Sequence, residues 1–151
     1  YQFAVRGKQV PGFNARTEKL AWPYKYSVGK RHCLVPAAGF YEWTGPKGDR
    51  TPHYITLRDG PMMFAGLWEN REVKGEQKDC FTILTTGPNA FMEPIHNRMP
   101  LMLSEQSWNK WLDLETEIDD LELQDSANMQ EHIVASLRGD HAGLIEPVGR
   151  G

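Results

Sequence analysis

The stretch RHCLVPAAGFYEW, residues 31–43, decides the fold class. It holds two short runs rich in β-branched and aromatic residues, His32–Val35 and Gly39–Trp43, which are typical of β-strands. Turn residues separate these runs from three more of the same kind: His53–Leu57, Met62–Trp68 and Cys80–Thr85. The glycine-containing segments 45–49 and 74–76 predict hairpin loops between neighbouring strands.

Helical patterns follow in the second half of the chain. Ser104 is a good helix cap, and the side chains after it that share one helical face are Trp108, Trp111 and Leu112. A second helix is predicted to begin at Asp125 and Ser126 and to stop at Gly139. Its helical spacing rests on four residues: Gln130, Ile133, Val134 and Leu137. Together these elements predict an α+β fold, with a mainly antiparallel, curved, barrel-like β core and helices at its margins.

The length of 151 residues suits a single domain over residues 1–151. Both ends of that domain look cut. The chain opens inside a Gly- and Pro-rich stretch, and it closes on Ile145–Val148, which has the pattern of a strand that is just beginning. We therefore expect a domain trimmed at the N-terminus and at the C-terminus.

The composition is that of a globular protein with an uneven charge distribution. Residues 1–58 hold ten Lys and Arg against three Asp and Glu, and residues 59–151 hold seven against seventeen, so that +7 and −10 give the net charge of −3. A basic half can offer a surface to a polyanion, although scattered solvated charges would give the same count. No signal peptide pattern and no membrane-spanning apolar run is visible. We expect a cytoplasmic protein without a membrane partner, nucleoid-associated if it is bacterial.

Several common enzyme classes find no support in the sequence. There is no Gly-rich phosphate loop, no GxSxG elbow and no HExxH zinc helix. Cys33 and Cys80 lie in apolar runs and form no CxxC pair, which favours small buried hydrophobes over zinc ligands or a disulfide framework. We expect neither a metal nor a cofactor.

Polar residues stand at four places that core packing does not explain. In an extended chain, Asn14 and Arg16 project from the same side, where an amide and a guanidinium suit phosphate. A turn Asn and a surface Arg are the alternative. Glu42 stands among large aromatics, and an apolar setting would raise its carboxyl pKa and suit acid–base chemistry. The alternating pattern around Glu42 equally allows a side chain that faces water.

The other two places follow later in the chain. His96 and Arg98 lie between Pro94 and Pro100, which restrict the backbone. A rigid segment with His and Arg suits anion handling or proton transfer, although a lone His is more often structural. Thr85 ends an apolar strand, where its hydroxyl can line a site or stabilise a turn.

In these segments the chain resembles the SOS response-associated peptidase (SRAP) family. The shared segments, in the family's order, are residues 14–18 (NARTE), 31–43 (RHCLVPAAGFYEW), 65–69 (AGLWE), 82–86 (TILTT) and 95–100 (IHNRMP). Five motifs in one order are a specific signature. The resemblance extends from Phe13 to about Leu112.

The resemblance implies a protein that recognises abasic sites in single-stranded DNA and bonds to them covalently. In the family, autoproteolytic loss of the initiator Met exposes an N-terminal cysteine. Its thiol and α-amine attack the aldehyde of the opened sugar and form a thiazolidine crosslink. Carried over by motif, Glu42 would be the acid–base, Asn14 would position the N-terminal residue or the sugar, and His96 would assist proton transfer. The implied DNA-binding residues are Arg16, Arg98, Trp43, Thr85 and Arg31.

The chain departs from the family at its N-terminus, where residue 1 is Tyr and the family's Cys-Gly-Arg segment is absent. Cys33 lies within the chain and offers no α-amine, so the chain as written should not form a thiazolidine. We expect the N-terminal segment of the same protein as a further partner. Two other functions stay open: a non-covalent single-stranded DNA binding module, and a peptidase that acts on other proteins, for which no complete nucleophile–base set is visible.

Overall fold

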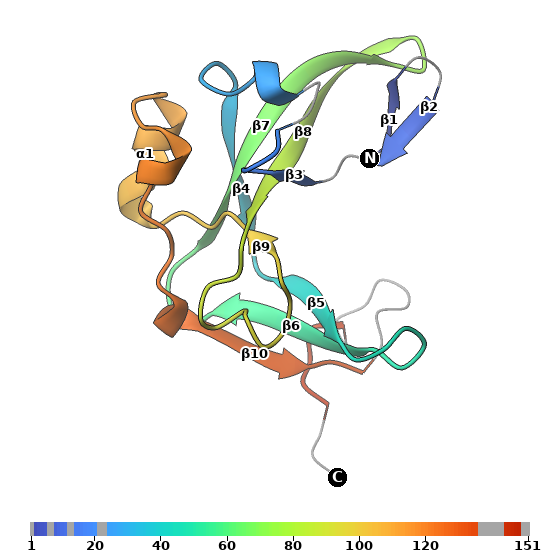
Figure 1. Ribbon diagram of the computed structural model, residues 1–151, viewed down its shortest axis with the longest axis vertical. Coiled ribbons are helices and arrows are strands. Elements are labelled where there is room, and N and C mark those ends of the chain that lie inside the picture. The colour runs from blue at the N-terminus through green and yellow to red at the C-terminus, as the bar shows by residue number, and fades with distance from the viewer. Residues whose placement is uncertain (1, 6–7, 12–13, 21–23, 136–143, 149–151) are drawn as a thin grey trace. The chain divides into compact units, whose positions relative to one another are not determined.

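The computed structural model describes residues 2–5, 8–11, 14–20, 24–135 and 144–148. These residues form mostly strands and one α-helix, α1 (Glu105–Leu112) (Figure 1). The strands are β1 (Gln2–Val5), β2 (Lys8–Pro11), β3 (Asn14–Arg16), β4 (His32–Ala37), β5 (Phe40–Thr44), β6 (Thr51–Leu57), β7 (Met62–Val73), β8 (Glu76–Thr86), β9 (Met99–Pro100) and β10 (Met129–Ile133). Three short 3₁₀ turns are η1 (Tyr24–Tyr26), η2 (Ile118–Asp120) and η3 (Ser126–Asn128).

The chain divides into two compact units, and three segments contribute to each. The first comprises the described parts of residues 1–36, 63–86 and 100–124, and the second those of 37–62, 87–99 and 125–151. The single domain predicted over residues 1–151 stays a prediction. The described strands form three sheets, and none of these sheets closes on itself. The α+β class with a mainly antiparallel β core is confirmed.

The first unit is built on a sheet with the strand order β3-β8-β7-β4. Strand β9 pairs with β8, and its residue Pro100 belongs to this unit. Strands β7 and β8 form a long antiparallel hairpin that curves along its length (Figure 1). Its turn has left-handed backbone at Lys74 (φ 53°) and Gly75 (φ 81°), which confirms the loop predicted there. Strand β3 runs parallel to β8, whereas β1 and β2 form a separate two-stranded sheet.

One face of this sheet forms the core of the first unit. Leu67 of β7 and Leu84 of β8 are fully buried on this face. The predicted helix after Ser104 is confirmed as α1 and contributes Trp111, which is also fully buried. The indole of Trp111 stacks on His32 with 3.5 Å between ring centroids, and its Nε1 donates to the carbonyl of Cys33 at 3.0 Å.

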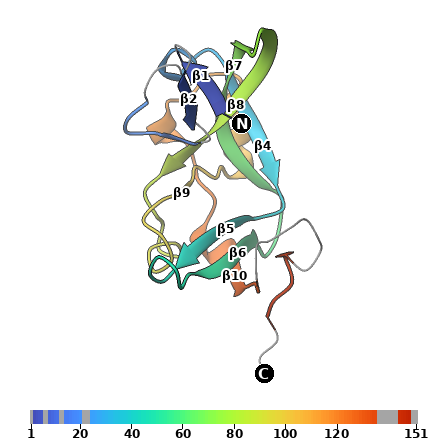
Figure 2. The same ribbon diagram turned by 90° about the vertical axis from the view of Figure 1, so that its right-hand side faces the viewer.

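The second unit is built on an antiparallel sheet with the order β10-β6-β5 (Figure 2). The predicted loop at 45–49 joins β5 to β6 and has left-handed glycines at Gly45 (φ 89°) and Gly48 (φ 101°). Just before β5, a Cβ on Gly39 would lie 2.6 Å from the carbonyl oxygen of Ile55. Only glycine lets the chain enter β5 this close to β6.

The helix predicted from Asp125 is wrong, because the chain forms η3 and then strand β10. The Asp125 side chain does accept a hydrogen bond from the backbone of Ala127 at 2.9 Å, so the capping signal is real. Beyond that cap, however, the backbone pairs antiparallel with β6, from Met129 opposite Leu57 to Ile133 opposite His53. Leu137 and Gly139 of the predicted helix lie outside the described residues.

The described residues 144–148 contain an isolated bridge and no strand. Val148 donates its backbone N–H to Ile133 at 2.9 Å, and Pro147 forms an isolated bridge with Val134, where the sequence predicted the start of a strand. Among the described residues, no helix has both the length and the apolar character needed to cross a membrane.

Candidate functional site

Glu42 lies in the middle of β5, with its side chain on the sheet face opposite to Tyr41 and Trp43. The side chain is 21% exposed, so the interpretation as a solvent-facing strand residue is not supported. Burial raises the pKa of the Glu42 carboxyl, while the nearby His96 and a hydrogen bond from the Trp43 backbone act in the opposite direction. A carboxyl of this kind can hold a proton closer to neutral pH than a surface glutamate can.

His96 is positioned by a tight turn of the chain between β8 and β9. Its backbone N–H donates to the carbonyl of Met92 at 2.9 Å, and Met92 itself is fully buried and anchors the turn. The Asn89 side chain caps this turn by accepting from the Met92 N–H at 3.0 Å. The backbone of Arg98 lies against the imidazole, with its N–H 3.1 Å from Nδ1. The Arg98 backbone therefore orients the ring at Nδ1.

The structure brings Glu42 and His96 together within the second unit. Oε1 of Glu42 lies 3.7 Å from Nδ1 of His96, and the imidazole is 39% exposed. This separation is longer than a hydrogen bond, and Nδ1 already lies within hydrogen-bond distance of the Arg98 backbone. Glu42 and His96 are therefore neighbours without a direct hydrogen bond between them. A half-buried acid beside an accessible imidazole can move a proton to or from a substrate.

The raised pKa of Glu42 predicts how a neutral replacement changes stability with pH. A carboxyl whose pKa is higher in the folded state binds its proton more tightly there, so its contribution to stability is full at low pH and is lost as pH rises through the folded pKa. We expect Glu42→Gln to raise the free energy of unfolding near neutral pH, because a neutral amide avoids burying a charge. The gap should close at about pH 4 and below. Thermal unfolding near neutral pH and at about pH 4 measures this difference in stability between the variant and the wild type. A Glu42→Gln variant that is less stable than wild type near neutral pH would contradict the expectation.

Asn14, Arg16 and Thr85 come together in the first unit. Strand β3 pairs with β8 so that Arg16 lies opposite Thr85, and both Asn14 and Arg16 are exposed on one side of the strand, as their spacing predicted. The hydroxyl of Thr85 donates to the carbonyl of Ala15 at 3.5 Å, and the Thr85 carbonyl accepts from the backbone of Thr17 at 3.0 Å. Thr85 lies within β8, one residue before its end, and it is buried.

The three remaining predicted residues have different surroundings. Trp43 is 40% exposed on β5, as a stacking residue must be. Arg98 is half-buried. Arg31 forms an ion pair with Glu69 at 2.8 Å and a hydrogen bond to Ser27 at 3.3 Å. Glu69 offsets much of the charge of Arg31, which weakens the case for it as a phosphate ligand.

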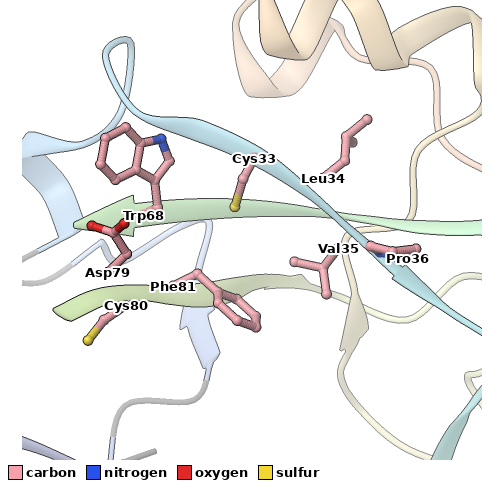
Figure 3. A pocket seen from close by; sticks show the side chains of 8 residues that line it. All are labelled: Cys33, Leu34, Val35, Pro36, Trp68, Asp79, Cys80 and Phe81. Carbon is pink, nitrogen blue, oxygen red and sulfur yellow. The ribbon is translucent and has the colours of Figure 1, made fainter. Parts of the chain in front are cut away.

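The outer face of the first unit's sheet carries a pocket of about 450 Å³ that sequence reasoning missed (Figure 3). It is lined by Cys33, Leu34, Val35, Pro36, Trp68, Asp79, Cys80 and Phe81. Trp68 and Phe81 are directly opposite each other in the β7–β8 register, and they are 38% and 48% exposed. The register also places Asn14 opposite Ile83, two residues beyond Phe81, so Asn14 shares this face. The available signal was the strand period, which puts Trp68 and Phe81 on the side away from the buried Leu67 and Leu84.

The thiols and the acidic groups do not form a metal site in the described part of the chain. Cys33 and Cys80 are both free, and burial raises the pKa of the Cys33 thiol. No group of three or more metal-ligating side chains occurs among the described residues.

Comparison with known proteins gives a consistent family. A family model described as SOS response associated peptidase (SRAP) matches residues 3–137. The abasic site processing protein YoqW of Bacillus subtilis is 34% identical over 135 residues, which cover 82% of this chain and 60% of YoqW. The abasic site processing protein HMCES of Xenopus tropicalis is 32% identical over 118 residues, which cover 64% of this chain and 35% of HMCES. The chain thus spans 60% or less of the length of these two relatives.

Solved structures share the fold of this chain. A protein from Bacteroides thetaiotaomicron superposes with a TM-score of 0.81 over 91% of this chain and 66% of its own, at 23% identity, which shows a shared fold. A protein from Bordetella bronchiseptica gives a TM-score of 0.69 at 27% identity, over 82% of this chain and 65% of its own. With a family model that covers most of its length, the chain belongs to the SOS response associated peptidase family.

Proposed function

We propose that this protein processes abasic sites in single-stranded DNA by forming a covalent crosslink with the damaged sugar. The observation that carries the proposal is the Glu42–His96 pair, a half-buried carboxyl with a raised pKa whose Oε1 lies 3.7 Å from an accessible imidazole. Membership in the family and relatives named abasic site processing proteins support the choice of substrate.

The chemistry requires an acid and a base at the sugar. An abasic sugar opens when a base removes the proton of the C1 hydroxyl and an acid protonates the ring oxygen, which yields an aldehyde. An α-amine adds to this aldehyde, water leaves to give an iminium, and the neighbouring thiolate closes a five-membered thiazolidine. Overall, one water molecule is released. Glu42 would exchange protons in ring opening and water loss, and His96 would assist it and orient the sugar oxygen.

The nucleophile needs a thiol and a free α-amine on the same residue. Cys33 and Cys80 lie inside β4 and β8, so their amines are peptide nitrogens. We place the nucleophile at an N-terminal cysteine of a longer form of the protein, exposed by autoproteolytic maturation. Asn14 would position that residue or the sugar through its amide.

The DNA strand would be held by charge and stacking. Arg16 and Arg98 would bind phosphates, with Thr85 at the site and a smaller contribution from Arg31. Trp43 would stack on a base, and the exposed Trp68 and Phe81 offer two more aromatic faces. Stacking on an aromatic side chain is worth about 1–3 kcal/mol per base.

A non-covalent single-stranded DNA binding module is the second candidate. The observation that favours it is the outer sheet face, where Asn14 lies on the same side as the exposed Trp68 and Phe81. A gel assay separates the two functions. The full-length protein is incubated with single-stranded DNA that carries one abasic site or none, and the products are denatured. We expect a covalent band only with the abasic DNA, and we expect His96→Ala to weaken it. Binding without a covalent band would favour the second candidate, and cleavage of an unrelated polypeptide would favour a peptidase.

The salt dependence of binding tests the two arginines. If each contacts one phosphate, Arg16→Ala and Arg98→Ala should each reduce the slope of log K against log salt by about 0.7. Fluorescence anisotropy with intact single-stranded DNA measures this slope over a salt series. Lys110→Ala, on helix α1, is a matched control that should leave it unchanged. If the slope of either arginine variant equals that of the wild type, that arginine does not contact a DNA phosphate.

A further inference from the structure

His53 lies directly across the sheet from Glu42. The two are register partners in the β5–β6 pair, so their side chains share one face and their Cβ atoms are about 5 Å apart. His53 is 12% exposed. The face of the second unit's sheet that carries the proposed acid–base group therefore carries a second imidazole.

Both ring nitrogens of His53 have side-chain partners. Nδ1 lies 2.9 Å from Oε2 of Glu131 on β10, and Nε2 lies 2.8 Å from the hydroxyl of Thr44 on β5. A carboxylate only accepts, so Nδ1 carries a hydrogen and donates it to Glu131. A hydroxyl can donate or accept, so Thr44 satisfies Nε2 whether that nitrogen is protonated or not.

This arrangement allows the ring to gain a proton without losing a contact. When the ring is neutral, the Thr44 hydroxyl donates to Nε2, and when the ring is charged, Nε2 donates to the hydroxyl oxygen. Protonation of His53 would therefore place a positive charge near Glu42 while the side chains stay where they are.

Three titratable groups among the described residues contact Glu42 or share its sheet face, and they come from three segments. They are His53 from β6, Glu131 from β10 and His96 from the turn before β9. We infer that His53, held by Thr44 and Glu131, is a positioning residue whose charge favours the ionised form of Glu42. The consequence of this role of His53 for catalysis rests on the proposed function. The interaction between His53 and Glu42 depends only on the folded chain.

Carbon-13 NMR of the glutamate side-chain carboxyls tests the inference directly. The Glu42 resonance is assigned by its loss in Glu42→Gln, and its titration midpoint is compared between wild type and His53→Phe. The Phe variant keeps a ring but cannot carry charge, and it leaves the Glu131 carboxylate without its imidazole partner. We expect the Glu42 midpoint to rise by about half to one pH unit.

Two further variants make the result specific. His53→Gln keeps polar atoms that can hydrogen-bond to Thr44 or Glu131 but takes up no proton, so it should also raise the Glu42 midpoint. This variant replaces His53→Phe in the test if the Phe variant does not fold. His132→Phe is the matched control, because His132 lies on β10 opposite Tyr54, on the other face of the same sheet. It should leave the midpoint unchanged. An unmoved or lowered midpoint in folded His53→Phe or His53→Gln would overturn the inference.

A kinetic arm separates this inference from the proposed function. In the full-length protein, the acid limb of the pH profile for crosslinking to abasic DNA should move to higher pH in His53→Phe by the same amount as the NMR midpoint. If no variant forms a crosslink but the NMR midpoint moves, the proposed function fails and the role of His53 stands. If crosslinking occurs and the midpoint does not move, only the role of His53 fails.

Discussion

Replacing Glu42 with Gln in the full-length protein is expected to slow crosslinking to an abasic site by about 100-fold or more. General acid–base groups contribute about 10²–10⁴-fold to such reactions, and Gln keeps the size of the side chain while losing the exchangeable proton. The Glu42 carboxyl is partly buried and its pKa is raised, which suits it to exchange a proton in this reaction. Single-turnover kinetics with abasic single-stranded DNA, resolved on denaturing gels, measure the rate.

The control for this prediction is the other carboxyl on the same sheet face. Glu131 contacts His53 rather than His96, so Glu131→Gln should slow the reaction far less than Glu42→Gln. DNA binding should be retained in both variants, because neither residue is proposed to hold a phosphate. A Glu42→Gln protein that crosslinks at the wild-type rate would remove Glu42 from the chemistry.

Replacing Trp111 with Ala is expected to destabilise the first unit by about 3–5 kcal/mol, the range for large aromatic side chains in a core. Trp111 is fully buried, stacks on His32 and donates to the carbonyl of Cys33, so the variant leaves a cavity and loses this hydrogen bond. For a chain of this length, that loss corresponds to a fall of about 10 °C or more in melting temperature. Thermal unfolding followed by circular dichroism measures it.

Trp108 is the matched control in the same helix. Its side chain is only half-buried, and its Nε1 donates to the Leu103 carbonyl at 3.2 Å. Trp108→Ala should therefore cost clearly less than Trp111→Ala. Equal losses would mean that the packing of α1 does not centre on Trp111.

Local chemistry accounts for the parts of the fold that the sequence predicted. The hairpin loops at 45–49 and 74–76 depend on glycines in left-handed backbone, and α1 depends on apolar spacing after Ser104. These signals lie within a few residues of the element they specify. Strand β10 was missed because its conformation is set by pairing with β6, a segment far away in the sequence. A correct capping residue, Asp125, was present and still led to the wrong element.

The candidate site could be predicted only in its parts. Motif resemblance selected Glu42 and His96, but their separation of 3.7 Å depends on a turn anchored by the buried Met92. The strand alternation left open whether Glu42 faces water, because the sequence does not say which sheet face is covered. The bonds of His53 to Thr44 and Glu131 were invisible for the same reason, since they join residues of three different strands.

The central claim is that Glu42 and His96 serve the covalent capture of an abasic site. The most direct test of this claim is to measure the intact mass of the reaction product. Full-length protein is incubated with single-stranded DNA that contains one abasic site. The mass of the denatured product is then measured by mass spectrometry. The expected product has the mass of protein plus DNA less one water molecule, and its yield should collapse in Glu42→Gln. Free protein and free DNA as the only species, under conditions where the two bind each other, would contradict the proposed function.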